Sequence, residues 1–162
     1  MPTIKITIIG GGFSGAMTAY HLLQQDKVAC AITIVEPALS NKGAGLGLAY
    51  STTCGDHLLN VCAAGMSALA NQPDDFLNYA RAKHPAVKAE DFLPRMLFGQ
   101  YIQELLNTAI ADNTAKANKN KCQFSLIKGQ AVDIEPTESH KNKPQYKVIL
   151  DNQQSLESDI VV

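Results

Sequence analysis

The sequence predicts an α/β fold with a central parallel sheet, and three observations support this prediction. Residues 3–9 form a short, β-branched apolar stretch that ends at three consecutive glycines. Residues 14–25 follow with apolar side chains at helical spacing, and residues 29–35 form a second apolar stretch that ends at Glu36. A strand, a glycine turn, a helix, a strand and an acid in this order are typical of a Rossmann-like βαβ unit.

The glycine turn has the spacing of a dinucleotide-binding motif, in which each glycine has a physical role. Gly10 permits the tight turn, Gly12 lets a pyrophosphate approach the backbone, and Gly15 lets the helix pack close to the strands. The free N–H groups at the start of the helix would face the phosphates. Glu36 would accept hydrogen bonds from the adenosine ribose and repel a 2′-phosphate, which disfavours NADP at this position. The alternative is a glycine turn that only joins strand to helix.

The rest of the chain departs from the plain doubly wound pattern. About 85 residues separate Glu36 from the next strand, and residues 38–72 are expected to be an ordered loop with short helical turns. The strands that follow predict a β-meander crossing before a last apolar strand, which we expect to lie parallel to the first two. The expected helices are 73–83 and 94–116, and the expected strands are 123–128, 131–135, 145–151 and 156–162, with a polar turn at 136–144.

The chain stops within the last expected strand, residues 156–162. Chain termini usually lie at the surface, whereas we expect these apolar residues to be among the most buried of the domain. We therefore interpret residues 1–162 as one Rossmann-like domain that is truncated at its C-terminus and belongs to a longer polypeptide.

The composition excludes several classes of protein. Fourteen Lys and Arg against fifteen Asp and Glu give a net charge of −1, so there is no basic excess for a nucleic-acid partner. No run approaches the ~20 apolar residues of a membrane span, and the glycines interrupt the apolar N-terminus too early for a signal peptide. We therefore expect a cytoplasmic protein with four reduced cysteines. Cys54, His57 and Cys62 are irregularly spaced and lack a fourth ligand, so no metal site is predicted.

Several segments, spread over nearly the whole chain, together resemble one group of flavoproteins. They are residues 8–15, Glu36-Pro37, residues 45–52, residues 57–61, Pro94-Arg95 with Gly99 and Tyr101, and residues 159–162. On these segments the chain resembles the N-terminal part of the bacterial FAD/NAD(P)-binding protein family. Members of this family have two dinucleotide-binding domains, of which the FAD domain is glutathione-reductase-like. The family is distantly similar to the N-hydroxylating monooxygenases of lysine and ornithine.

The resemblance implies a set of residues that follow FAD from its pyrophosphate to its two ends. They are Gly10, Gly12, Phe13, Ser14 and Gly15 at the pyrophosphate, Glu36 and Pro37 at the ribose, Ala49, Tyr50, Ser51, Asn60 and Val61 toward the flavin, and Val132 with its backbone against the adenine. The stretch 45–61 also has an alternative interpretation as a glycine-rich surface loop. Tyr50, His57 and Arg95 are candidate catalytic groups, but the sequence assigns a catalytic role to none of them.

The resemblance also implies a cofactor and a reaction class. FAD would be bound here, and NAD(P)H would be bound by a second nucleotide domain outside these residues. We therefore expect the N-terminal FAD-binding region of a flavin-dependent oxidoreductase that acts on a small molecule. The first alternative is an FAD- or NAD-binding module with a regulatory or scaffold role and no turnover. The second is a plain NAD-dependent dehydrogenase, which the long segment after Glu36 disfavours.

The resemblance finally predicts how these residues behave in isolation. Since the second nucleotide domain would lie outside them, the 162 residues alone should bind FAD weakly or not at all. They should show no NAD(P)H-dependent turnover.

Overall fold

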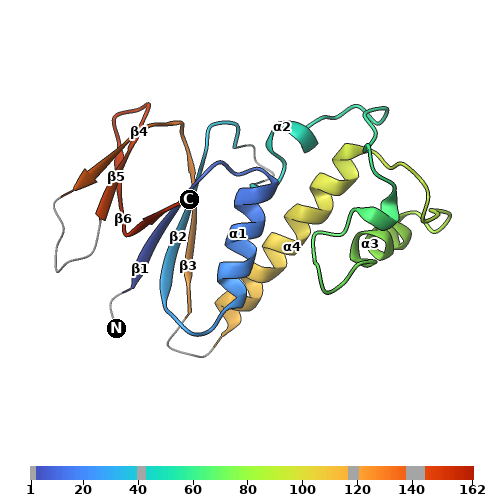
Figure 1. Cartoon of the computed structure of the whole chain (residues 1–162), viewed down its shortest axis with the longest axis horizontal. Coiled ribbons are helices and arrows are strands. Elements are labelled where there is room, and N and C mark those ends of the chain that lie inside the picture. The colour runs from blue at the N-terminus through green and yellow to red at the C-terminus, as the bar shows by residue number, and fades with distance from the viewer. Residues whose placement is uncertain (1–2, 40–42, 117–120, 138–144) are drawn as a thin grey trace.

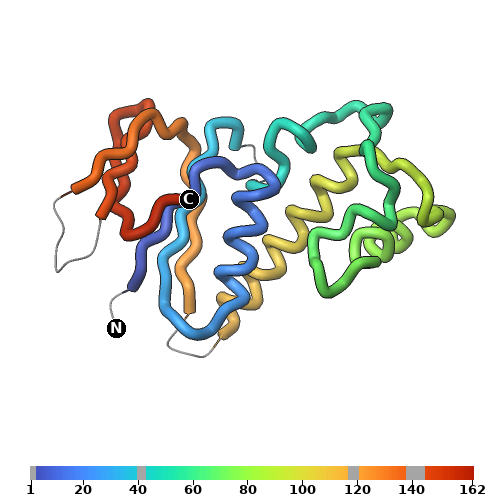
Figure 2. The backbone as a smooth tube through the Cα atoms, viewed as in Figure 1, coloured from blue at the N-terminus to red at the C-terminus, as the bar shows by residue number. Residues whose placement is uncertain are grey.

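The structure is a computed structural model that describes residues 3–39, 43–116, 121–137 and 145–162. Its elements form layers: a small antiparallel sheet, a parallel sheet, helix α1, helix α4, and finally α3 at the far end (Figures 1 and 2). The elements are β1 (Ile4–Ile9), α1 (Phe13–Gln24), β2 (Cys30–Glu36), α2 (Gly47–Tyr50), the 3-10 turn η1 (Ala63–Gly65), α3 (Asp75–Lys83), α4 (Arg95–Ala115), β3 (Gln123–Lys128), β4 (Ala131–Thr137), β5 (Gln145–Leu150), β6 (Ser155–Ser158) and β7 (Ile160–Val161).

The parallel sheet has the strand order β3-β2-β1-β7. β1 pairs with β2 in the register Ile6↔Ile32, and β2 pairs with β3 in the register Ile32↔Phe124. β7 pairs with the other side of β1, and all of these pairings are parallel. The predicted α/β fold with a Rossmann-like parallel sheet is therefore confirmed.

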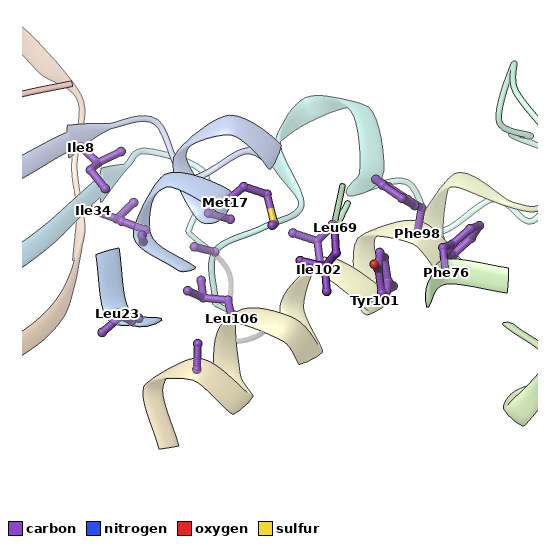
Figure 3. Packing of buried hydrophobic residues seen from close by; sticks show 14 of the residues in the cluster. Ile8, Met17, Leu23, Ile34, Leu69, Phe76, Phe98, Tyr101, Ile102 and Leu106 are labelled. Atoms are coloured by element: carbon purple, nitrogen blue, oxygen red, sulfur yellow. The ribbon is translucent and has the colours of Figure 1, made fainter. Parts of the chain in front are cut away.

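Alternate side chains of the central strands point to opposite faces of this sheet, because the side-chain period of a strand is two. Ile8 of β1 and Ile34 of β2 belong to the large core under the helices, whereas Val35 belongs to a second core with Val148 and Leu150 of β5. Figure 3 shows the large core running from the sheet through α1 to α4. The helices and β5 therefore cover opposite faces of the parallel sheet.

The extent of the meander was predicted wrongly. The segment 123–128, assigned to the meander, is β3 of the parallel sheet, and the meander itself is β4-β5-β6. The segment 156–162, predicted as one parallel strand, divides at Asp159. Its first part pairs antiparallel with β5, and its second part pairs parallel with β1.

The division at Asp159 has a local cause. The Lys5 N–H donates a 2.8 Å hydrogen bond to Asp159 Oδ2, and the Asp159 N–H donates to the Lys5 carbonyl. The buried hydroxyl groups of Ser158 and Thr7 also hydrogen-bond to each other. These bonds attach the chain to β1 at the point where it leaves one sheet and enters the other.

The last residues are not among the most buried of the domain, which corrects a second expectation. Ile160 and Val162 expose 45% and 55% of their surface. The reason is that β7 is an edge strand, and β1 is its one partner in the parallel sheet of the described residues.

Helices α3 and α4 pack against each other through aromatic side chains. Tyr101 is buried, donates a 2.7 Å hydrogen bond to Asp75 and accepts one from the Ala68 N–H. Burial raises the pKa of Tyr101 to about 12, and the bond to Asp75 raises it as well. Burial, together with Glu104, raises the pKa of Tyr79 to about 12.

The cysteines also differ from the expectation. Cys30 and Cys122 are joined by a disulfide. The expectation of four reduced cysteines was therefore wrong for these two residues. The cause is the pairing of β2 with β3, since Ala31 lies opposite Gln123 and the residues before them are therefore neighbours. The two other cysteines of the chain are free.

Candidate dinucleotide site

The glycine loop lies at the carboxyl end of β1, where the chain turns from strand to helix. Gly10 has a φ of +101°, a conformation that side-chain-bearing residues rarely adopt, and its N–H donates a 2.8 Å bond to the Val35 carbonyl. A Cβ at Gly15 would overlap the carbonyl oxygen of Gly10. Gly10 therefore permits the turn and Gly15 permits the close approach of helix and strand, as the sequence predicted.

The start of α1 presents a row of unpaired backbone donors. Within the described ranges, the N–H groups of Gly12, Phe13, Ser14 and Gly15 have no hydrogen-bond partner, and no side chain caps the helix. The first turn contains no acidic residue that would neutralise its partial positive charge. Phe13 and Ser14 are exposed, Phe13 at 38%. This helix start can bind an anion through its backbone.

Glu36 stands beside this loop at the end of β2. Its Oε2 accepts a 2.7 Å hydrogen bond from the Gly11 N–H, and its Oε1 accepts a 2.9 Å bond from the Ala38 N–H. Both bonds fix the carboxylate next to the loop, while each oxygen keeps a second lone pair. Pro37 follows on the surface. The structure thus brings together the acid and the glycines that the sequence predicted as one site.

Segment 43–50 covers the other side of the loop. The Gly45 N–H donates a 2.6 Å hydrogen bond to the Gly11 carbonyl. The ring of Tyr50 packs against Phe98 of α4 at 5.0 Å between centroids, and Phe13 packs against the same ring at 6.0 Å. Ala49 is exposed beside them. Tyr50 and the glycine loop therefore share one neighbourhood, built on the start of α4.

The later part of the long loop is attached to α4 instead. The Arg95 N–H donates to the His57 carbonyl at 2.8 Å, and Arg95 Nε donates to the Leu58 carbonyl at 3.0 Å. Thr52 Oγ1 and His57 Nδ1 lie 2.7 Å apart in a further hydrogen bond. His57 and Arg95 thus fix the loop backbone, which is a structural role.

Ser51, Asn60, Val61 and Val132 lie on segments beyond those described above and have no hydrogen bond to the glycine loop within the described part of the chain. Ser51, Asn60 and Val61 are exposed on the loop between α2 and η1. Val132 is 57% exposed in β4, and the chain reaches it from Gly129, whose N–H donates to the Glu36 carbonyl at 3.3 Å.

Sequence reasoning missed Gly11 and Gly47. Gly11 supplies the donor that holds Glu36, and a Cβ there would lie 3.0 Å from the Glu36 Cβ. Gly47 has a φ of +51° and lies against Gly12. The alternation of glycines at 43, 45 and 47 is the sequence signal that could have drawn attention to this contact.

The described part of the chain contains neither a metal centre nor a membrane-spanning helix. No group of three His, Cys, Asp or Glu side chains there could hold a metal ion, and Cys54 is exposed while Cys62 is half-buried. No helix among the described residues is long and apolar enough to cross a membrane.

The parallel sheet, the glycine loop and the adjacent acid define a dinucleotide-binding domain of the Rossmann-like class. The model of the FAD-NAD(P)-binding family matches residues 7–162. The chain belongs to this family, which confirms the resemblance stated from the sequence.

The individual relatives are much longer than this chain. The uncharacterized protein YdhS of Escherichia coli (strain K12) is 29% identical over 135 residues, which are 75% of this chain and 24% of that protein. The open crystal structure of cyclohexanone monooxygenase matches 99% of this chain and 26% of its own, with a TM-score of 0.53 and 12% identity. The crystal structure of tetracycline destructase Tet(51) matches 99% of this chain and 38% of its own, with a TM-score of 0.51 and 15% identity. The chain thus spans about a quarter of the curated relative, and the two structures share its fold.

Proposed function

We propose that this chain is the FAD-binding region of a flavin-dependent oxidoreductase that is reduced by NAD(P)H. The observation that carries the proposal is the row of unpaired N–H groups at the start of α1, next to a carboxylate fixed at the end of β2. A pyrophosphate needs the first of these features and an adenosine ribose needs the second. Membership of the FAD-NAD(P)-binding family supports the same ligand class.

The residues present fit such a cofactor. A Cβ at Gly10 would meet no atom within 4 Å, and a Cβ at Gly12 would meet only the Cα of Gly47, at 3.6 Å, so neither position of the loop is tightly covered. In this proposal the residues divide along the cofactor as the resemblance to the family implies. Gly10, Gly12, Phe13, Ser14 and Gly15 hold the pyrophosphate, Glu36 and Pro37 the ribose, Val132 the adenine, and Ala49, Tyr50, Ser51, Asn60 and Val61 the portion toward the flavin.

A bound flavin supplies hydride and electron-transfer chemistry, and the protein supplies binding and orientation. This chain's own contribution is a set of backbone donors for the phosphates and a fixed acceptor for the ribose hydroxyls. His57 and Arg95 are engaged in fixing the loop backbone, so neither is assigned a proton-transfer role. We place the NAD(P)H site in a second nucleotide-binding domain of a longer polypeptide, a proposal supported by the greater length of YdhS.

One observation favours a second function. Glu36 and Arg95 are already hydrogen-bonded to backbone groups, and no acid–base pair is evident among the described residues. A dinucleotide-binding module with a regulatory or scaffold role and no turnover has the same binding residues and needs no such pair.

The test uses the protein purified from its native cells, in the form in which those cells make it. We expect a yellow protein whose flavin absorption is bleached under anaerobic conditions by one equivalent of NADH or NADPH. A flavin that is bound but bleached by neither nucleotide would favour the module without turnover. A protein that binds NAD but no FAD would contradict the flavin-dependent oxidoreductase and leave the NAD-binding module as the function.

A further inference from the structure

Helix α2 lies between the start of α1 and the start of α4, as Figure 1 shows. On one side the Gly45 N–H bonds to the Gly11 carbonyl at 2.6 Å. On the other side Tyr50 packs on Phe98 of α4. Gly45 and this four-residue helix therefore form one connection between the glycine loop and α4, beside the direct contact of Phe13 with Phe98.

The contacts on the two sides of α2 are so close that a side chain has no room at Gly47 or at Gly99. A Cβ at Gly47 would lie 2.9 Å from the Cα of Gly12, closer than real Cβ atoms come to backbone atoms. A Cβ at Gly99 of α4 would lie 2.9 Å from the Tyr50 Cβ and 3.0 Å from the Tyr50 carbonyl oxygen. Two of these three neighbours are backbone atoms, which cannot rotate away as the end of a flexible side chain can.

We propose that Gly47 and Gly99 are positioning residues for the dinucleotide site. They let α2 pack as a spacer between α4 and Gly12. The position of α4 then determines where Gly12 and the free N–H groups at the start of α1 lie. Neither residue touches the ligand in this proposal. The inference rests on the proposed function for the identity of the ligand, but the coupling between α4 and the loop is a property of the chain alone.

The same contact predicts a reciprocal effect. If the packing of α2 against the loop changes the affinity of the loop for a ligand, then ligand binding must change the stability of that packing by the same free energy. Occupation of the loop should therefore slow exchange of the Gly45 amide hydrogen, which is bonded to Gly11.

The experiment measures hydrogen exchange of backbone amides by NMR in the ligand-free 162-residue chain, and the same variants are titrated with FAD. Gly47→Ala and Gly99→Ala are compared with Gly55→Ala, a matched control whose Cβ would meet no atom within 4 Å. We expect both variants to speed exchange at Gly45 and to weaken FAD binding, each by about tenfold. Exchange at Ile8 in the centre of the sheet should change by less than about threefold, and Gly55→Ala should match the wild type.

Faster exchange at Gly45, together with no FAD binding by the longer protein purified from its native cells, would support the spacer and contradict the proposed ligand. Unchanged exchange at Gly45, or equal acceleration at Gly45 and Ile8, would overturn the spacer. If Gly99→Ala does not fold, Leu46→Ala replaces it, because the Leu46 Cδ2 is the atom closest to the Cβ position of Gly99 and its removal loosens α2 without a clash. Exchange at Gly45 like that of the wild type in Leu46→Ala would overturn the spacer as well.

Discussion

Gly12 and Gly15 belong to one motif, yet the structure predicts that alanine has different effects at the two positions. A Cβ at Gly12 would lie 3.6 Å from the Cα of Gly47, which is ordinary van der Waals contact, and the backbone there has φ −75° and ψ −164°. A Cβ at Gly15 would overlap the Gly10 carbonyl oxygen and lie 3.2 Å from Ile8 Cγ2. Gly12 is thus dispensable for the fold, and Gly15 is not.

The magnitudes follow from these contacts. Gly12→Ala replaces an N-cap glycine, which should lower the free energy of unfolding by no more than about 1 kcal/mol. Gly15→Ala forces a backbone shift between helix and strand, which should cost about 1–3 kcal/mol. If a pyrophosphate approaches Gly12 closely, the added methyl group should also reduce FAD affinity by more than about tenfold.

Urea denaturation followed by circular dichroism gives the stabilities, and titration with FAD followed by flavin fluorescence gives the affinities. The expected result is that Gly12→Ala keeps its stability and loses its ligand. Wild-type FAD affinity in Gly12→Ala would refute the role given to Gly12. A loss of stability in Gly12→Ala as large as in Gly15→Ala would refute the assignment of separate roles.

Three further predictions concern the acid, the tyrosines and the disulfide. Glu36→Ala should weaken FAD binding by roughly 1.5–3 kcal/mol, the scale of charge-assisted hydrogen bonds, and unchanged affinity in the titration would contradict the ribose assignment. Because the pKa values of Tyr79 and Tyr101 are raised to about 12, the native state keeps protons that the unfolded state releases above about pH 10. The free energy of unfolding should therefore fall as pH rises from 10 toward 12, and urea denaturation that gives a constant value over this range would disagree. Reduction of the Cys30–Cys122 disulfide, which has a sequence separation of 92, should lower the free energy of unfolding by about 2–5 kcal/mol, and identical urea curves with and without reductant would count against a native disulfide.

The elements nearest the N-terminus were predictable because their signals are local. The first strand, the glycine turn, the first helix and the second strand each follow from a run of neighbouring residues. The structure places these elements at Ile4–Ile9, Phe13–Gln24 and Cys30–Glu36, close to the predicted bounds. The long helix, expected at 94–116, is found at Arg95–Ala115 for the same reason.

The parts that were missed depend on partners distant in sequence. Nothing within residues 123–128 indicates that this strand pairs with β2 and not with the meander. The division at Asp159 depends on Lys5, which lies 154 positions earlier, and the disulfide depends on the register of β2 and β3.

In the site, too, the local features could be predicted and the contacts between distant residues could not. The glycines and Glu36 were found from their spacing, whereas the bond from Gly11 to Glu36 and the contact of Gly47 with Gly12 require the folded chain.

The central claim is that the start of α1 binds the pyrophosphate of FAD, and NMR titration of the backbone amides tests it most directly. The 162-residue chain, labelled with ¹⁵N, is titrated with FAD and separately with ADP up to millimolar concentration, which detects weak binding. We predict that both ligands shift the amide signals of Gly12, Phe13, Ser14 and Gly15, and that the signal of Gly55 does not move. Unmoved signals at the start of α1, or shifts confined to another part of the chain, would contradict the account.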